Sequence, residues 1–379
     1  MDLDRNGTYV GRVWRAGIGP CLVHLRQGRL WDVTSPAAPT MRDLLELPDP
    51  IRQVAASPGT DLGPVESWLA RIEPAADSDH LLSPADLQAV KACGVTFARS
   101  MVERVIEERA GGDPARAQEI RARVAGVIGD SLRSLVPGSE KAAEVKRLLQ
   151  AEGLWSQYLE VGIGPDAEVF TKCPPMASVG SGASVGLHPI SHWNNPEPEV
   201  VLAVASTGRI VGASLGNDVN LRDVEGRSAL LLGKAKDNNA AAAIGPFIRL
   251  FDDRWDLEDV RRLDLTLTVR GADGFELQGR SSMAEISRDP SDLVAQALGR
   301  HHQYPDGMML YCGTMFAPTQ DRDGPGQGFT HHPGDLVTIA APGLGALVNP
   351  VRLATEAPEW TFGAGALMRN LARRGLLAG

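Results

Sequence analysis

The stretch Trp193–Phe247 reads WNNPEPEVVLAVASTGRIVGASLGNDVNLRDVEGRSALLLGKAKDNNAAAAIGPF, and its first part predicts a strand that opens on two acidic residues. Glu197 and Glu199 lead into an apolar, β-branched run, and residues two apart in a strand project from the same face. Pro196 and Pro198 lack the N–H that a sheet ladder needs, which confines them to a strand start or an edge. The pattern therefore predicts two carboxylates that aim at one point.

A second strand is expected to bring a third carboxylate. After a turn at Ser206–Gly208, the apolar run Arg209–Leu215 leads into Asp218, where a polar loop begins. Three carboxylates without a neighbouring Cys or His pair favour Mg²⁺, Mn²⁺ or Ca²⁺ over zinc. An octahedral ion would keep positions for a water and two oxygens of a 2-oxo acid, and Lys236 could balance that anion. The alternative is that these are solvated surface groups.

Several longer motifs in one order carry a family resemblance. WNNPEPEVVL, GNDVNLRD, EGRSALLLGKAKDNN, HHQYPDG and GTMFAP together resemble the sugar-acid dehydratase branch of the fumarylacetoacetate hydrolase superfamily, from about Leu81 to the C-terminus. The resemblance implies that Glu197, Glu199 and Asp218 bind a divalent metal and that Lys236 is catalytic. It implies an α+β fold: a small β-rich N-terminal module (1–80), then a mixed β-sandwich-roll catalytic domain (81–379) with a helical insertion at about 110–152.

The resemblance also singles out the segment after Gly94. Hydrolases of this superfamily carry a His and a Glu three residues apart after an aromatic, and they use the pair to activate water. Aligning that aromatic with Phe97 puts Ser100 at the histidine position and Glu103 at the glutamate position. The hydrolases' base is then absent, whereas loss of water needs a weaker base because the metal acidifies the proton. We expect Glu103 and Ser100 to serve proton transfer and Phe97 to contact substrate; by composition alone, Glu103 is a surface acid.

Two further matches concern substrate binding. Lys172 follows an aromatic, as a family lysine does, although an exposed strand lysine is the alternative reading of that position. Gly313 and Thr314 match a Gly-Thr pair that binds the substrate carboxylate in the family; without the resemblance, Thr314 would be a turn residue.

Composition restricts the class of partner. The net charge of −9 and the lack of a basic run argue against nucleic acid and anionic membranes, so a small-molecule substrate is expected. The four cysteines are far apart in sequence, which is typical of buried thiols in a reducing compartment. No apolar run of 18 residues and no signal-peptide pattern appear, so we expect a cytoplasmic enzyme. By analogy it would be a homodimer or homotetramer.

The implied reaction is Mg²⁺-dependent dehydration of a 2-keto-3-deoxy sugar acid, such as 2-keto-3-deoxy-D-xylonate, to 2-oxoglutarate semialdehyde in pentose degradation. One alternative is an acylpyruvate-type C–C hydrolase, which would need a histidine from another loop: His188, His192, His301 or His302. Another is a non-catalytic sugar-acid-binding paralogue, because an arginine and an aspartate expected before Trp193 in the closest dehydratases are missing here.

The remaining pattern predicts ordinary elements. Ser83 and Pro84 are expected to start a helix that ends near Gly94. Ser139–Gly153 is expected to be a helix, and Asp273-Gly274 is expected to be the turn of a hairpin.

Overall fold

The computed structural model describes residues 3–111, 113–117, 120, 135–151, 153 and 155–377, without the side chains of residues 98–100, 102 and 107. Its strands are β1 (Tyr9–Arg15), β2 (Gly19–Arg26), β3 (Arg29–Asp32), β4 (Thr60–Pro64), β5 (His80–Leu82), β6 (Ala89–Gly94), β7 (Glu168–Cys173), β8 (Val185–Leu187), β9 (Asn194–Asn195), β10 (Pro198–Val204), β11 (Ile210–Asp218), β12 (Asn220–Leu221), β13 (Ala242–Leu250), β14 (Asp264–Arg270), β15 (Glu276–Ser282), β16 (Met308–Tyr311), β17 (Leu336–Ala341) and β18 (Gly345–Leu353). Its α-helices are α1 (Met41–Glu46), α2 (Pro50–Ala56), α3 (Val65–Leu69), α4 (Ala98–Ala110), α6 (Glu140–Ala151), α7 (Gln157–Ile163), α8 (Arg222–Glu225), α9 (Leu232–Lys236), α10 (Leu257–Val260), α11 (Pro290–Ala297) and α12 (Ala364–Arg373). Along these ranges, no helix is both long and apolar enough to cross a lipid bilayer.

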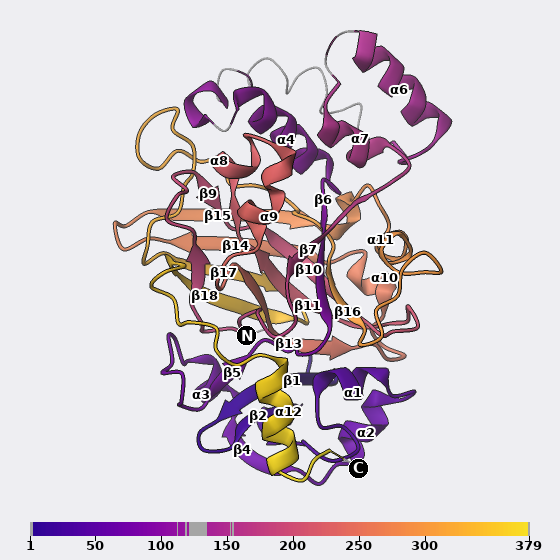
Figure 1. Cartoon of the computed structure of the whole chain (residues 1–379), viewed down its shortest axis with the longest axis vertical. Coiled ribbons are helices and arrows are strands. Elements are labelled where there is room, and N and C mark those ends of the chain that lie inside the picture. Colours follow the sequence, from indigo (N-terminus) through magenta and orange to yellow (C-terminus); the bar gives the residue numbers. More distant parts are fainter. Residues whose placement is uncertain are drawn as a thin grey trace.

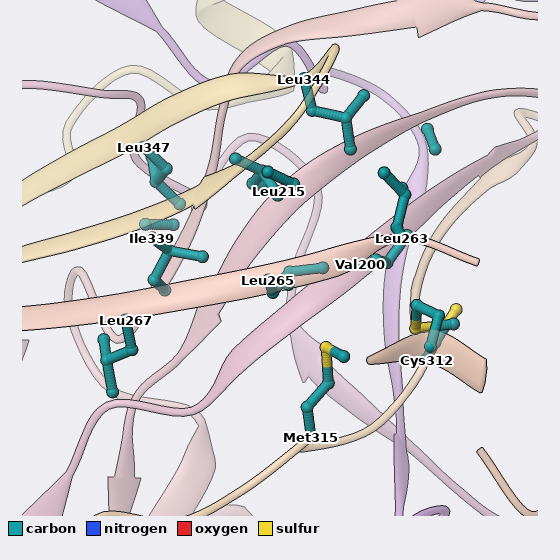
Figure 2. Packing of buried hydrophobic residues seen from close by; sticks show 14 of the residues in the cluster. Val200, Leu215, Leu263, Leu265, Leu267, Cys312, Met315, Ile339, Leu344 and Leu347 are labelled. Atoms are coloured by element: carbon teal, nitrogen blue, oxygen red, sulfur yellow. The ribbon is translucent and has the colours of Figure 1, made fainter. Parts of the chain in front are cut away.

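Two large sheets form the centre of the structure (Figure 1). The larger sheet runs in the order β4-β3-β2-β1-β13-β11-β10-β16-β6-β7, and the smaller one in the order β15-β14-β17-β18-β8. Apolar side chains from both sheets meet in one buried cluster, where Val200 and Leu215 of the larger sheet face Leu265, Ile339 and Leu347 of the smaller one (Figure 2). This rigid core holds the ends of β10 and β11, which carry the acidic residues.

The N-terminal strands continue the large sheet. β1 pairs with β13 through Tyr9↔Arg249 and Val10↔Ile248, and β5 pairs with β1. The expected division of the chain at residue 80 falls inside β5, so the two-domain organisation stays a prediction. Helix α12 lies beside β2 (Figure 1), where Asn370 donates to the backbone oxygen of Ile18 at 2.7 Å.

The prediction of a helix that starts at Ser83 is wrong: residues 83–88 are irregular, with bends at 84 and 86–88, and β6 follows. The reason is tertiary. The Asp86 carboxylate accepts the N–H groups of Met41 at 2.7 Å and Arg42 at 3.0 Å, so it caps α1. The guanidinium of Arg12 takes the backbone oxygens of Ser83 and Ala85, which a helix would have used.

Helices α4, α6 and α7 lie over one end of the larger sheet (Figure 1). α4 packs against α7 through Met101, Val105, Ile106 and Leu159, all buried. The predicted helix Ser139–Gly153 is found as α6, and residues 114–117 are helical. The rest of the expected insertion, residues 112, 118–119, 121–134 and 152, lies outside the described residues.

Candidate active site

The three predicted carboxylates do meet at one point. Glu197 directly precedes β10, Glu199 lies within it, and Asp218 ends the neighbouring strand β11. The antiparallel register places the N–H of Asp218 3.0 Å from the backbone oxygen of Glu197. One oxygen from each carboxylate lies within 4.8 Å of the others, and all three residues are buried. Pro196 and Pro198 lie at the start of β10. Because β10 lies between β11 and β16, they are not on a sheet edge, and that alternative prediction is wrong.

Two buried lysines neutralise this cluster. Lys236, the last residue of α9, places its Nζ 2.5 Å from Glu197 Oε2 and 3.2 Å from Asp218 Oδ2. Lys172 Nζ lies 2.7 Å from Asp218 Oδ1 and donates to the backbone oxygens of Val219 and Lys236. The side chain of Lys172 is fully buried, so the alternative of an exposed strand lysine is wrong. Lys172 therefore positions both Asp218 and the end of α9.

An arginine that the sequence motifs did not single out adds a third positive charge beside the cluster. Arg104 of α4 pairs with Glu197 Oε1, and its other terminal nitrogen lies 3.0 Å from Glu225 Oε2. Burial alone would raise the pKa of Glu197, but the charges of Lys236 and Arg104 outweigh it and lower the pKa to about 2. Glu197 is thus held as a carboxylate without any metal.

Glu199 is held differently. It accepts the N–H of Gly313 at 2.7 Å and the hydroxyl of Thr314 at 3.2 Å, and within the described residues it makes no ion pair. Burial, together with the charges of Asp218 and Glu197, raises the pKa of Glu199 well above its usual value. A buried carboxyl group that lacks a cation, beside two that share theirs, is the setting that a hard divalent cation would complete.

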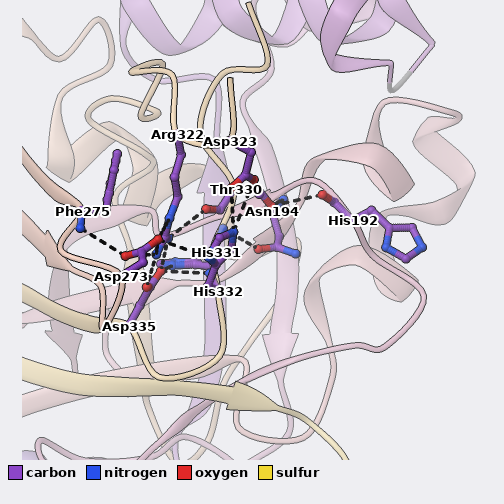
Figure 3. Close-up of polar contacts among 10 residues, drawn as sticks. All are labelled: His192, Asn194, Asp273, Phe275, Arg322, Asp323, Thr330, His331, His332 and Asp335. Carbon is purple, nitrogen blue, oxygen red and sulfur yellow. Dashed lines mark hydrogen bonds and ion pairs between the residues drawn. The ribbon is translucent and has the colours of Figure 1, made fainter. Parts of the chain in front are cut away.

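The loop that carries Gly313 needs glycine. Its φ is +101°, and a Cβ there would lie 2.0 Å from the hydroxyl oxygen of Thr96. Further along the same loop, side chains form a buried network (Figure 3). The guanidinium of Arg322 lies 2.7 Å from both carboxylate oxygens of Asp335, and Asp335 also contacts the ring of His331. The N–H of His331 reaches the side chain of Asn194, three residues before Glu197. The network therefore fastens the Gly313–Thr314 loop to the segment that carries the triad.

The hydrolase-type positions lie beside the cluster. Glu103 pairs with Arg222 at 3.3 Å, and the guanidinium of Arg222 stacks over the ring of Trp193. Phe97 is buried in the core and forms an isolated bridge with Ile286. The side chain of Ser100 lies outside the described residues.

A cavity of about 10 Å³, room for about one water molecule, lies beside Glu197 and Asp218 of the triad. Its lining comprises Cys93, Gly94, Val95, Arg104, Glu168, Phe170, Glu197, Asp218, Glu225, Lys236 and Thr314. Glu168 was not predicted as a site residue. Burial and the charge of Glu225 raise its pKa to about 7, against the opposing charges of Arg104 and Lys236. The sequence pattern could have predicted this position, because Glu168, Phe170 and Lys172 alternate along β7 and so share one face of the strand.

Comparison with known proteins agrees with this fold. The model of the fumarylacetoacetate (FAA) hydrolase C-terminal family matches residues 164–352. The chain is 30% identical over 213 residues to a probable 2-keto-3-deoxyxylonate dehydratase of Haloferax volcanii, covering 56% of this chain and 68% of that protein. It is also 30% identical over 185 residues to the 2-dehydro-3-deoxy-D-arabinonate dehydratase of Saccharolobus solfataricus, covering 49% of this chain and 58% of that one.

Solved structures confirm the α+β fold. An apo 2-keto-3-deoxy-D-arabinonate dehydratase superposes with a TM-score of 0.64 at 19% identity, covering 91% of this chain and 99% of that one. A structure of 2-keto-3-deoxy-D-arabinonate dehydratase complexed with magnesium and 2,5-dioxopentanoate gives a TM-score of 0.62 at 20% identity over the same shares. The family expected from the sequence motifs is therefore confirmed: the chain belongs to the fumarylacetoacetate hydrolase family.

Proposed function

We propose that this protein is a Mg²⁺-dependent hydro-lyase that removes water from a 2-keto-3-deoxy sugar acid. The observation that carries the proposal is the buried triad Glu197, Glu199 and Asp218 beside a small cavity that Glu168 and Lys236 also line. The relatives named above are dehydratases of such acids, and one related structure contains magnesium with 2,5-dioxopentanoate. That compound is 2-oxoglutarate semialdehyde, the product expected here.

The donor set suits Mg²⁺, with Mn²⁺ or Ca²⁺ as possible substitutes, because hard cations prefer carboxylate oxygens. The bound cation would supply Lewis acidity that polarises the C2 ketone and acidifies the C3 protons. The surrounding charge favours an anionic substrate. With a divalent cation present, the triad and Glu225 face that cation and three cationic side chains, those of Lys172, Lys236 and Arg104. The site then carries one positive charge while Glu168 is protonated and is neutral when Glu168 is ionised.

Glu168 is the cavity residue best suited to move protons. With a pKa of about 7, it is present in both protonation states at neutral pH, as an acid–base group should be. The proton of C3 would pass to its carboxylate, leaving an enolate whose oxygen Lys236 stabilises. The electron pair of the enolate then forms the C3=C4 bond as the C4–O bond breaks, and the departing hydroxyl takes the proton from Glu168 and leaves as water.

The product requires two more proton shifts. Loss of a proton from C5 and return of a proton to C3 convert the unsaturated acid to an enol, and the enol becomes the aldehyde of 2,5-dioxopentanoate. Glu103 stays the second candidate for these transfers, with Ser100, although Glu103 pairs with Arg222 and is not part of the cavity lining. Lys172, Gly313 and Thr314 would hold the triad in place or bind the substrate carboxylate. Phe97, which is buried, would support the site from the core.

The names of the two relatives describe one substrate when both sugars are of the D series. Oxidation at C2 and loss of oxygen at C3 leave C4 as the single stereocentre, and D-xylose and D-arabinose share its configuration. We therefore propose the five-carbon 2-keto-3-deoxy-D-pentonate as substrate, from pentose breakdown. A homodimer or homotetramer stays a prediction.

The hydrolase alternative lacks its base. Of the described residues that line the cavity, none is a histidine, and His192, His301 and His302 are exposed at the surface. His188, half-buried, accepts a hydrogen bond from the backbone of Ile190. A silent binding protein is not favoured either, because the triad and Lys236 are all in place.

Incubation of the purified protein and Mg²⁺ with 2-keto-3-deoxy-D-pentonate, and separately with an acylpyruvate, tests the proposal. We expect 2,5-dioxopentanoate from the first and no cleaved acids from the second. Glu199→Ala should abolish turnover. Aldehyde formation that survives this substitution would exclude the metal role, and cleavage of the acylpyruvate alone would make the protein a hydrolase.

A further inference from the structure

Arg104 binds Glu197, one of the three carboxylates that would bind the proposed cation. Both oxygens of Glu197 are taken: Oε1 by Arg104 and Oε2 by Lys236. A cation that binds Glu197 together with Glu199 and Asp218 would share this carboxylate with two positively charged side chains, and repulsion between like charges disfavours keeping both of them in place.

The surroundings indicate which side chain moves. Lys236 ends a short helix whose last carbonyl accepts a hydrogen bond from Lys172 at 2.6 Å, and its Nζ is shared with Asp218, a second member of the triad. Arg104 instead comes from α4, outside the sheet, and its second partner is Glu225 of α8, which is not part of the triad. Glu225 can keep the guanidinium after Glu197 is released, so the arginine would not be left buried without a counter-charge.

We propose that Arg104 is an internal competitor for the metal site, which holds Glu197 while the cation is absent and lowers the affinity for the cation. The inference rests on the metal site of the proposed function. It makes Arg104 a positioning residue: by exchanging Glu197 for Glu225 alone, it couples cation binding to the contact between α4 and α8.

This coupling has a structural basis in two successive residues of α4. Glu103 pairs with Arg222 at the start of α8, and Arg104 pairs with Glu225 at its end. Two ion pairs thus join α4 to α8: α4 supplies the acid in one and the base in the other. The ion pair between Arg104 and Glu197 is a third contact of α4, and the cation would remove only that one.

The test is the affinity for Mn²⁺ alone, measured by calorimetry and by the electron paramagnetic resonance signal of free Mn²⁺. Arg104→Met should bind Mn²⁺ about ten-fold or more tightly than the wild type, because a charge-assisted hydrogen bond to the ligand no longer has to be broken. That variant also removes a positive charge and the ion pair between residue 104 and Glu225. The double variant Arg104→Met/Glu225→Gln keeps the net charge of the wild type and leaves neither group unpaired, so it should fold where the single variant fails and should still bind more tightly.

The outcomes separate the inference from the proposed function. Tighter binding by the double variant, abolished when Glu199→Ala is added, supports the inference. Wild-type or weaker affinity in the double variant overturns it, while the metal site stands as long as Glu199→Ala alone abolishes binding. Mn²⁺ binding by the wild type that is absent, or that survives Glu199→Ala, overturns the metal site and the inference with it.

Discussion

Glu168→Gln should remove most of the activity while leaving the metal site intact. The substitution keeps the size of the side chain and removes its ability to exchange a proton. A positioned acid–base group contributes about 10²- to 10⁴-fold to a rate. We therefore expect kcat to fall by that factor, or about 3–5 kcal/mol of barrier, with the affinity for Mn²⁺ nearly unchanged, because Glu168 is not a member of the triad.

The pH profile follows from the raised pKa. Burial and the charge of Glu225 raise the pKa of Glu168 to about 7 in the metal-free protein. A bound cation lowers this pKa, so with Mg²⁺ the carboxylate that accepts the C3 proton forms as the pH rises through a value below about 7. The value of kcat/KM should rise over that interval in the wild type, and this rise should be absent from the residual activity of Glu168→Gln.

Steady-state formation of 2,5-dioxopentanoate measures both quantities, and exchange of the C3 protons in D₂O isolates the first step. Glu276→Gln is the matched control, because Glu276 also opens a strand but is exposed and remote from the cavity. Glu168→Gln with wild-type kcat and normal C3 exchange would refute the assignment. Loss of exchange in Glu103→Gln instead would transfer the role to Glu103.

Three further changes test other parts of the structure. Lys236→Met should lower kcat about 10²- to 10³-fold, as expected for one oxyanion-stabilising donor; full activity would remove this lysine from the mechanism. Arg322→Met should destabilise the fold by about 3–5 kcal/mol in urea unfolding, because it removes the arginine that pairs with the buried Asp335. A loss below about 1 kcal/mol would contradict the importance of the network. Despite burial, hydrogen bonds from Arg322 and His331 hold the pKa of Asp335 well below its usual range. The ionised Asp335 should therefore stabilise the folded protein fully above about pH 4, and this contribution should be lost as the pH falls. The pH-dependent contribution should be smaller in Arg322→Met. Leu265→Ala in the core of Figure 2 should cost about 2–5 kcal/mol by the same assay, and a cost under 1 kcal/mol would mean that this core repacks.

Much of the metal site could be predicted from sequence because its geometry is local. Glu197 and Glu199 are two residues apart at a strand start, and Asp218 ends the next antiparallel strand, so the pleat and one turn bring all three together. The hairpin at Asp273-Gly274 and helix α6 depend on equally local signals, and both were found.

Other features depend on contacts between distant segments, which a single sequence does not show. Arg104 reaches Glu197 across 93 residues, and nothing in the local pattern of α4 separates it from a surface arginine. The Ser83 segment carries helix-capping signals, but Asp86 caps a helix 45 residues earlier. Lys172 illustrates an intermediate case: its alternation with Glu168 predicts a shared face, whereas its burial depends on pairing with Asp218.

The central claim is that three acidic side chains hold one divalent cation. Anomalous scattering from a crystal grown with Mn²⁺ tests it most directly. We predict one strong peak at about 2.0–2.3 Å from a carboxylate oxygen of Glu197, Glu199 and Asp218, a typical range for hard divalent cations. A structure in which Lys236 and Arg104 still hold Glu197 and the manganese lies elsewhere would contradict the account.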